Sequence, residues 1–96
     1  MVVTLRDLLT CLDTIAPFAM AESWDNVGLM IGDKSRAVTS ILAGLDPTNK
    51  LLQEAVAIGA DTVITHHPAI FKPLPHIDTS DPGGKFVETA MQHNIN

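Results

Sequence analysis

A strand–helix–strand pattern in the middle of the chain limits its fold more than any other feature. An apolar run from Val38 to Leu45 is followed by Asp46-Pro47-Thr48, which supplies helix-capping residues and a proline suited to a first helical turn. Gly59 stands where a left-handed helix end belongs, and Thr62–Thr65 has the composition of a short buried strand. The inward face of the intervening helix is formed by Leu51, Leu52, Ala55 and Val56. This order predicts a βαβ unit, with parallel strands and a right-handed crossover.

The flanking segments add helices and one further strand. Thr4 is expected to cap a first helix, with Asp7 in a capping-box position, and Pro17 is expected to end it. The apolar run Val27–Ile31 is predicted to be a strand. A proline-rich loop follows residue 67, and a last helix is expected at roughly 84–93. The whole chain is therefore predicted to be an α/β protein.

Composition excludes several classes of protein. Ninety-six residues allow one domain at most, and a net charge of −5 with scattered basic residues argues against nucleic acid as a partner. No apolar run approaches the roughly 20 residues of a membrane span, and the N-terminus lacks the pattern of a secretion signal. The single cysteine, Cys11, cannot form an internal disulfide, which fits a reducing cytoplasm.

His66 and His67 are the strongest candidates for a functional site. They close the second predicted strand, and Asp46 follows the first, so all three belong to the carboxyl edge of a parallel sheet, where ligands bind in such folds. A buried polar pair there would need a partner, and imidazole is a common ligand of transition metals. Metal binding is therefore predicted for His66 and His67.

Alternative interpretations of this edge remain open. Adjacent strand residues point to opposite faces, so the two histidines share one metal only if the strand ends or kinks before Pro68. Each histidine could instead bind a different ion of a two-metal centre. In the simplest structural interpretation one histidine is a core residue and the other faces solvent. Asp46 is expected to be a helix cap rather than a catalytic acid.

Two histidines are fewer ligands than a metal normally requires. In addition, the chain stops at Ile95-Asn96, where another parallel strand would be starting. Either His66 and His67 are not ligands, or the remaining ligands lie beyond Asn96 or on another chain. Both observations together predict a fragment that is truncated after its third helix.

Several motifs in order show a resemblance to a known family. These motifs are Ala21-Glu22-Ser23-Trp24-Asp25-Asn26-Val27-Gly28-Leu29, Leu45-Asp46-Pro47-Thr48, Gly59-Ala60-Asp61, and Thr65-His66-His67-Pro68 with Ile70-Phe71-Lys72-Pro73-Leu74. From about Thr4 to the last residue, the chain closely resembles the N-terminal part of the Nif-three-like family. Members of that family are often labelled type-2 GTP cyclohydrolase I homologues.

The resemblance implies a cytoplasmic protein with a Rossmann-like three-layer α/β/α sandwich and ring-shaped hexamers. It also implies a dinuclear centre of two divalent ions (zinc, iron or manganese), with His66 and His67 among the ligands. His76 and His93 match no ligand of the family. The Trp24-Asp25-Asn26 segment is a family signature without an assigned chemical role.

Three functions are compatible with these residues. The first is a metal-dependent hydrolase acting on a nucleotide-like or other heterocyclic small molecule, as the GTP cyclohydrolase label implies. The second is a non-catalytic metal-binding or interaction scaffold. The third is a purely structural domain, which applies only if the family resemblance is misleading.

Overall fold

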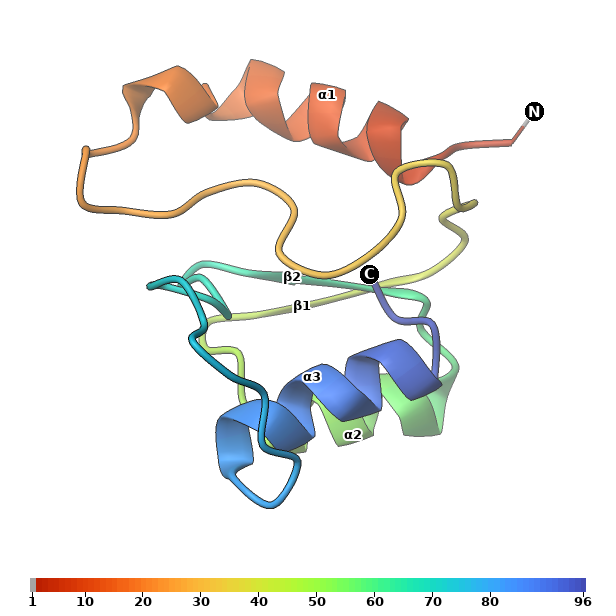
Figure 1. Ribbon diagram of the computed structural model, residues 1–96. Helices are drawn as coiled ribbons and strands as arrows, with labels where there is room; N and C mark the ends of the chain where they lie inside the picture. Colours follow the sequence, from red (N-terminus) through yellow and green to blue (C-terminus); the bar gives the residue numbers. More distant parts are fainter. Residues whose placement is uncertain (1) are drawn as a thin grey trace.

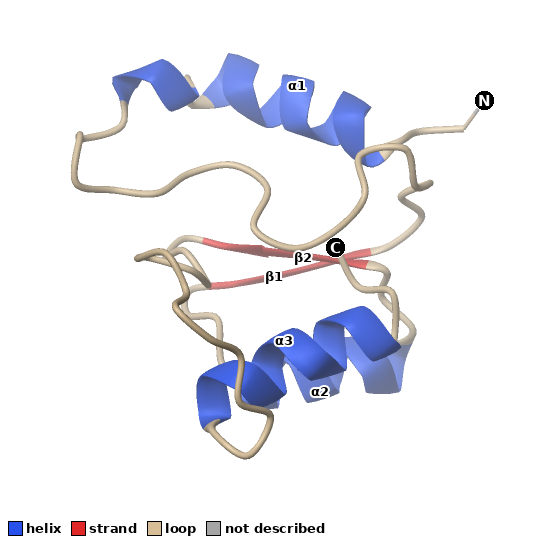
Figure 2. Cartoon of the chain, viewed as in Figure 1, coloured by secondary structure: helices blue, strands red, loops and turns tan. Residues whose placement is uncertain are grey.

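The computed structural model describes residues 2–96 and confirms an α/β fold (Figure 1). Helices and strands alternate in the second half of the chain, whereas residues 21–37 form no helix (Figure 2). In chain order the elements are α1 (Leu5–Ile15), a short 3-10 helix η1 (Phe18–Met20), β1 (Ile41–Gly44), α2 (Asn49–Ile58), β2 (Thr62–Thr65) and α3 (Pro82–Gln92).

The two strands form the parallel pair that the sequence predicts. Ile41 lies opposite Thr62, and Gly44 lies opposite Thr65. The predicted bounds of β2 are confirmed, whereas β1 occupies only the second half of the apolar run 38–45. Gly59 ends α2 with a φ of 75°, the left-handed conformation that glycine adopts without steric cost.

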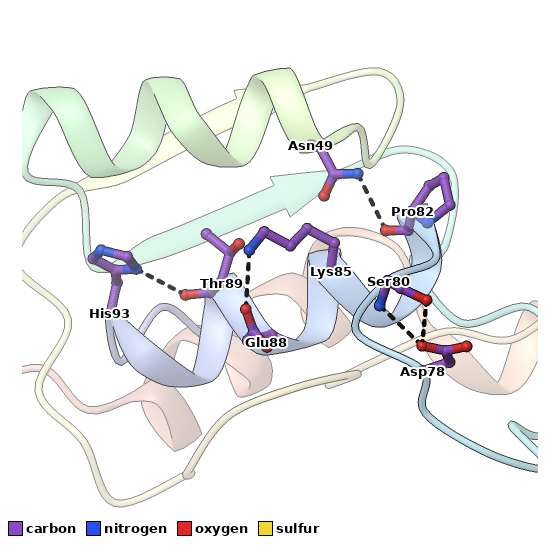
Figure 3. Close-up of polar contacts among 8 residues, drawn as sticks. All are labelled: Asn49, Asp78, Ser80, Pro82, Lys85, Glu88, Thr89 and His93. Atoms are coloured by element: carbon purple, nitrogen blue, oxygen red, sulfur yellow. Dashed lines mark hydrogen bonds and ion pairs between the residues drawn. The ribbon is translucent and has the colours of Figure 1, made fainter.

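The elements form three layers (Figure 1). Helices α2 and α3 cover one face of the strand pair, and α1 lies on the other side. The core lies mainly between the strands and the α2–α3 layer, and it consists of Leu52, Ala55, Ala60, Ala90 and Ile95. At one end of this layer the Asn49 side chain donates a hydrogen bond to the Pro82 carbonyl over 3.1 Å, which joins the starts of α2 and α3 (Figure 3).

Helix α1 begins with the predicted capping box. The Thr4 hydroxyl accepts a hydrogen bond from the Asp7 amide, and the Asp7 carboxylate accepts one from the Thr4 amide. These bonds to Thr4 hold the pKa of Asp7 below its usual value. Two backbone bonds, from Leu5 to the Arg36 carbonyl and from Val38 to the Val3 carbonyl, connect the start of α1 to the segment before β1.

The predicted strand at Val27–Ile31 is wrong, because this segment pairs with no strand among the described residues. Gly28 and Gly32 have φ values of 102° and 146°, which interrupt an extended path on both sides. Leu29, Met30 and Ile31 are nevertheless half-buried. Side-chain burial therefore explains the apolar character of this run, without backbone pairing.

Helix α3 begins two residues earlier than predicted. Pro82 occupies the first turn, where its missing N–H removes no helical hydrogen bond. At the other end His93 is the C-cap, and its Nδ1 lies 3.0 Å from the Thr89 carbonyl (Figure 3). His93 therefore has a structural role at the end of α3.

After α3 the backbone returns to the sheet. The Asn96 amide donates to the Asp61 carbonyl over 2.9 Å, and the Val63 amide donates to the Asn96 carbonyl over 2.8 Å. These two hydrogen bonds hold Asn96 beside β2 in the pattern of a parallel pair. Within residues 2–96 no helix combines the length and apolar composition that crossing a bilayer requires.

Candidate metal site

The carboxyl edge of the strand pair brings Asp46 and the two histidines together. Backbone pairing continues past the strands: the His66 amide donates to the Gly44 carbonyl over 3.2 Å, and the His67 amide donates to the Leu45 carbonyl over 3.1 Å. Because Gly44 lies opposite Thr65, extending the register by two residues places Asp46 opposite His67. The sequence prediction that these residues share one edge is confirmed.

The rings of His66 and His67 lie close together instead of diverging. Their centroids are 5.0 Å apart, and their planes meet at 59°. Regular strand geometry ends at Thr65, whose hydroxyl donates a hydrogen bond to the His67 carbonyl over 2.6 Å and closes a tight turn. The strand end that a shared site requires is therefore present.

Both histidines are exposed, which corrects two expectations. The sequence argument that a buried polar pair needs a partner does not apply, because these two side chains are not buried. The simplest structural interpretation, with one histidine in the core, is also wrong. What distinguishes the pair is the proximity of the two rings at the sheet edge.

Asp46 does not cap α2, which corrects the prediction made for it. Thr48 is the N-cap, and its hydroxyl accepts a hydrogen bond from the Leu51 amide over 3.0 Å. The Asp46 carboxylate instead lies 2.6 Å from Nδ1 of His67. More than half of each side chain in this pair is exposed, 55% for Asp46 and 56% for His67. The sequence placed both residues at this edge of the sheet but predicted no contact between them.

The Trp24-Asp25-Asn26 segment supports the loop that follows the histidines. The Asn26 side chain donates a hydrogen bond to the Ile70 carbonyl over 2.5 Å, across 44 positions of sequence. The rings of Trp24 and Phe71 are 6.3 Å apart and tilted by 56°, within the range of aromatic pairs. This signature therefore has a structural role that sequence reasoning did not assign.

An apolar hollow of about 480 Å³ is lined by α1, by the strand pair and by residues of the α2–α3 layer. Its lining includes the inner face of α1 and the 26–31 segment, and His66 and Pro68 border it at the carboxyl edge. One histidine of the pair therefore adjoins a space of the size that small molecules occupy in proteins.

The donor set fits part of a divalent metal site. Two neighbouring, exposed imidazoles are suitable ligands for zinc, iron or manganese. Within residues 2–96, however, no group of three or more histidine, cysteine, aspartate or glutamate side chains is arranged to hold a metal. His93 is engaged at the end of α3, and His76 lies exposed in the loop before that helix.

Comparison with known proteins identifies relatives along the whole chain. The Duf34/NIF3 (NGG1p interacting factor 3) family model matches residues 3–96. A Staphylococcus aureus (strain COL) protein named "GTP cyclohydrolase 1 type 2 homolog" is 45% identical over 92 residues, which represent 96% of this chain and 25% of the relative. This chain thus spans about a quarter of that relative's length.

Solved structures agree with this match. Staphylococcus aureus protein SA1388 superimposes with a TM-score of 0.94 and 44% identity, over 98% of this chain and 27% of that one. A Bacillus cereus protein related to NIF3 gives a TM-score of 0.92 and 32% identity, over 99% and 26% of the two chains. The resemblance of the sequence motifs is thereby confirmed, and the chain belongs to the Duf34/NIF3 family.

Proposed function

We propose that this chain contributes His66 and His67 as ligands to a divalent-metal site of a metal-dependent hydrolase. The observation that carries the proposal is the proximity of the two imidazole rings, 5.0 Å apart at the carboxyl edge of a parallel strand pair. A divalent ion at this edge would supply Lewis acidity to a hydrolytic reaction. The chain's own residues present the ligands and border the adjoining hollow.

The proposed substrate is a nucleotide-like or other heterocyclic small molecule. Two features support this class: the name of the relatives, which refers to GTP cyclohydrolase, and the hollow that His66 borders. The lining of this hollow is mainly apolar, so it would take an apolar face of a heterocycle and does not select guanine. We further propose two ions per full-length chain, a hexameric assembly and a cytoplasmic location, as the family resemblance implies.

A non-catalytic metal-binding scaffold is the second candidate function. The observation in its favour is that the Asp46 carboxylate, which lies 2.6 Å from Nδ1 of His67, is already engaged. Turnover separates the two functions. A metal-loaded protein that hydrolyses GTP or another nucleotide, and loses this activity with His66→Ala/His67→Ala, is an enzyme. Stoichiometric metal without turnover of any nucleotide tested supports the scaffold.

Metal binding itself is tested by zinc calorimetry of three proteins: the native chain, His66→Ala/His67→Ala, and the control His76→Ala/His93→Ala. The control removes the same number of imidazoles from exposed positions outside the proposed site. We expect weak zinc binding by the native chain and its control, and none by the first variant. Binding that survives in His66→Ala/His67→Ala refutes the ligand assignment.

The strength of binding provides a further check. Two ligands seldom hold a metal tightly, because structural and catalytic sites use three or more. Tight zinc binding by the native chain would show that it contains ligands beyond His66 and His67. In a protein that includes the other family segments, we expect about two ions per chain, the number of a dinuclear centre, and their loss in the double variant.

A further inference from the structure

The Asp46–His67 contact determines which nitrogen of the His67 ring carries a proton. An ionised carboxylate only accepts hydrogen bonds. Since the Asp46 carboxylate lies 2.6 Å from Nδ1 of His67, Nδ1 must be the donor. In the neutral ring the lone pair then resides on Nε2.

We propose that Asp46 is a positioning residue, which fixes His67 in the Nδ1–H tautomer and leaves Nε2 as its metal-binding atom. The inference deepens the proposed function and rests on it for the identity of the ligand. Histidines that bind metals commonly donate their other ring N–H to a carboxylate, which sets the tautomer and the ring orientation. Asp46 is placed to perform this role although it lies 21 residues away in the sequence.

Three contacts hold the two residues in this geometry. The His67 amide donates to the Leu45 carbonyl, and the His67 carbonyl accepts from the Thr65 hydroxyl. The Asp46 carbonyl accepts from the Thr48 amide over 3.0 Å. Both backbones are therefore positioned independently of the side-chain contact. Because Thr48 caps α2, helix formation makes no demand on the Asp46 carboxylate.

The two histidines of the pair differ in this respect. Within residues 2–96 the His66 ring has no hydrogen-bond partner, whereas His67 is oriented by Asp46. His93 provides an internal reference, because its Nδ1 lies 3.0 Å from the Thr89 carbonyl, which can only accept. We therefore expect His67 and His93 to share one tautomer, and His66 to sample both.

Nitrogen-15 NMR of the histidine rings tests the tautomer in the metal-free protein at a pH where the rings are neutral. We expect His67 to be protonated on Nδ1 in the native chain and to become a mixture in Asp46→Ala. Asp46→Asn should preserve the native tautomer, since the amide oxygen also accepts a hydrogen bond. Glu54→Ala, which removes the same charge from the exposed face of α2, is the matched control. The His93 signals should stay unchanged in all variants.

Zinc titration of the same variants tests the consequence for binding. Asp46→Ala should weaken zinc binding about 10- to 100-fold, the usual effect of removing such a partner. Asp46→Asn should recover most of the affinity, and Glu54→Ala should leave it unchanged. A native His67 tautomer in Asp46→Ala, or unchanged zinc affinity once that tautomer is lost, overturns the inference. Zinc binding that survives His66→Ala/His67→Ala instead refutes the proposed function and leaves the tautomer result intact.

Discussion

Two adjacent glycines in α3 should respond oppositely to the same substitution. A Cβ added at Gly84 would overlap the Asp78 carbonyl oxygen, because real Cβ atoms essentially never approach another atom within 3.0 Å. That oxygen also accepts a hydrogen bond from the Asp81 amide over 3.0 Å, and Ser80 holds the same turn through the Asp78 carboxylate (Figure 3). Gly84→Ala must therefore displace the turn as a whole.

The expected cost of Gly84→Ala is about 2–4 kcal/mol, from overpacking of about 1–3 kcal/mol and one weakened hydrogen bond of about 1 kcal/mol. Gly83 has open space around its Cβ position, so Gly83→Ala should stabilise the helix by about 0.5 kcal/mol. Urea denaturation followed by circular dichroism measures both free energies of unfolding. Equal stabilities of the two variants would refute this account of the close approach at Gly84.

Four further substitutions test contacts near the site and at the start of the strand pair. Thr48→Ala should lower the free energy of unfolding by about 1 kcal/mol in urea denaturation, as loss of an N-cap does, whereas Asp46→Ala should change it much less. Asn26→Ala leaves the Ile70 carbonyl without its donor, so hydrogen exchange in the 69–72 loop should become faster, while exchange in α2 stays the same. Burial raises the pKa of Asp61, but hydrogen bonds from Thr39, Thr62 and Ser40 outweigh it and hold the pKa below its ordinary value of 3.8. Because the folded pKa is depressed, this stabilisation is present above that value and lost as the pH falls below it, and Asp61→Asn should flatten the acid part of the curve of unfolding free energy against pH.

The βαβ unit could be predicted because its signals are local and consistent. Gly59 has the one conformation that a glycine after an amphipathic helix usually adopts, and Thr62–Thr65 is bounded on both sides by non-strand residues. The failure at Val27–Ile31 has a physical cause. A short apolar run indicates burial, and burial without strand pairing produces the same composition as a buried strand.

The candidate site was predictable in its location but not in its contacts. Parallel strands bring their carboxyl ends to one edge, which sufficed to associate Asp46 with His66 and His67. Thr48 rather than Asp46 caps α2, and the Asp46 carboxylate instead contacts His67, 21 residues away. The local sequence pattern around Asp46 contains no information about that contact. The Asn26–Ile70 bond, across 44 residues, was beyond sequence reasoning for the same reason.

The sparse packing of α1 has a consequence for local unfolding of the chain. Leu5 is the only buried residue of this helix, and α1 contributes nothing to the core cluster between the strands, α2 and α3. Local unfolding should therefore release α1 at a lower free energy than it releases the strand pair. Amide protons of α1 would then exchange through partial opening, while those of β1 and β2 would exchange only when the remaining structure unfolds. The edge that presents His66 and His67 thus belongs to the more persistent part of the molecule.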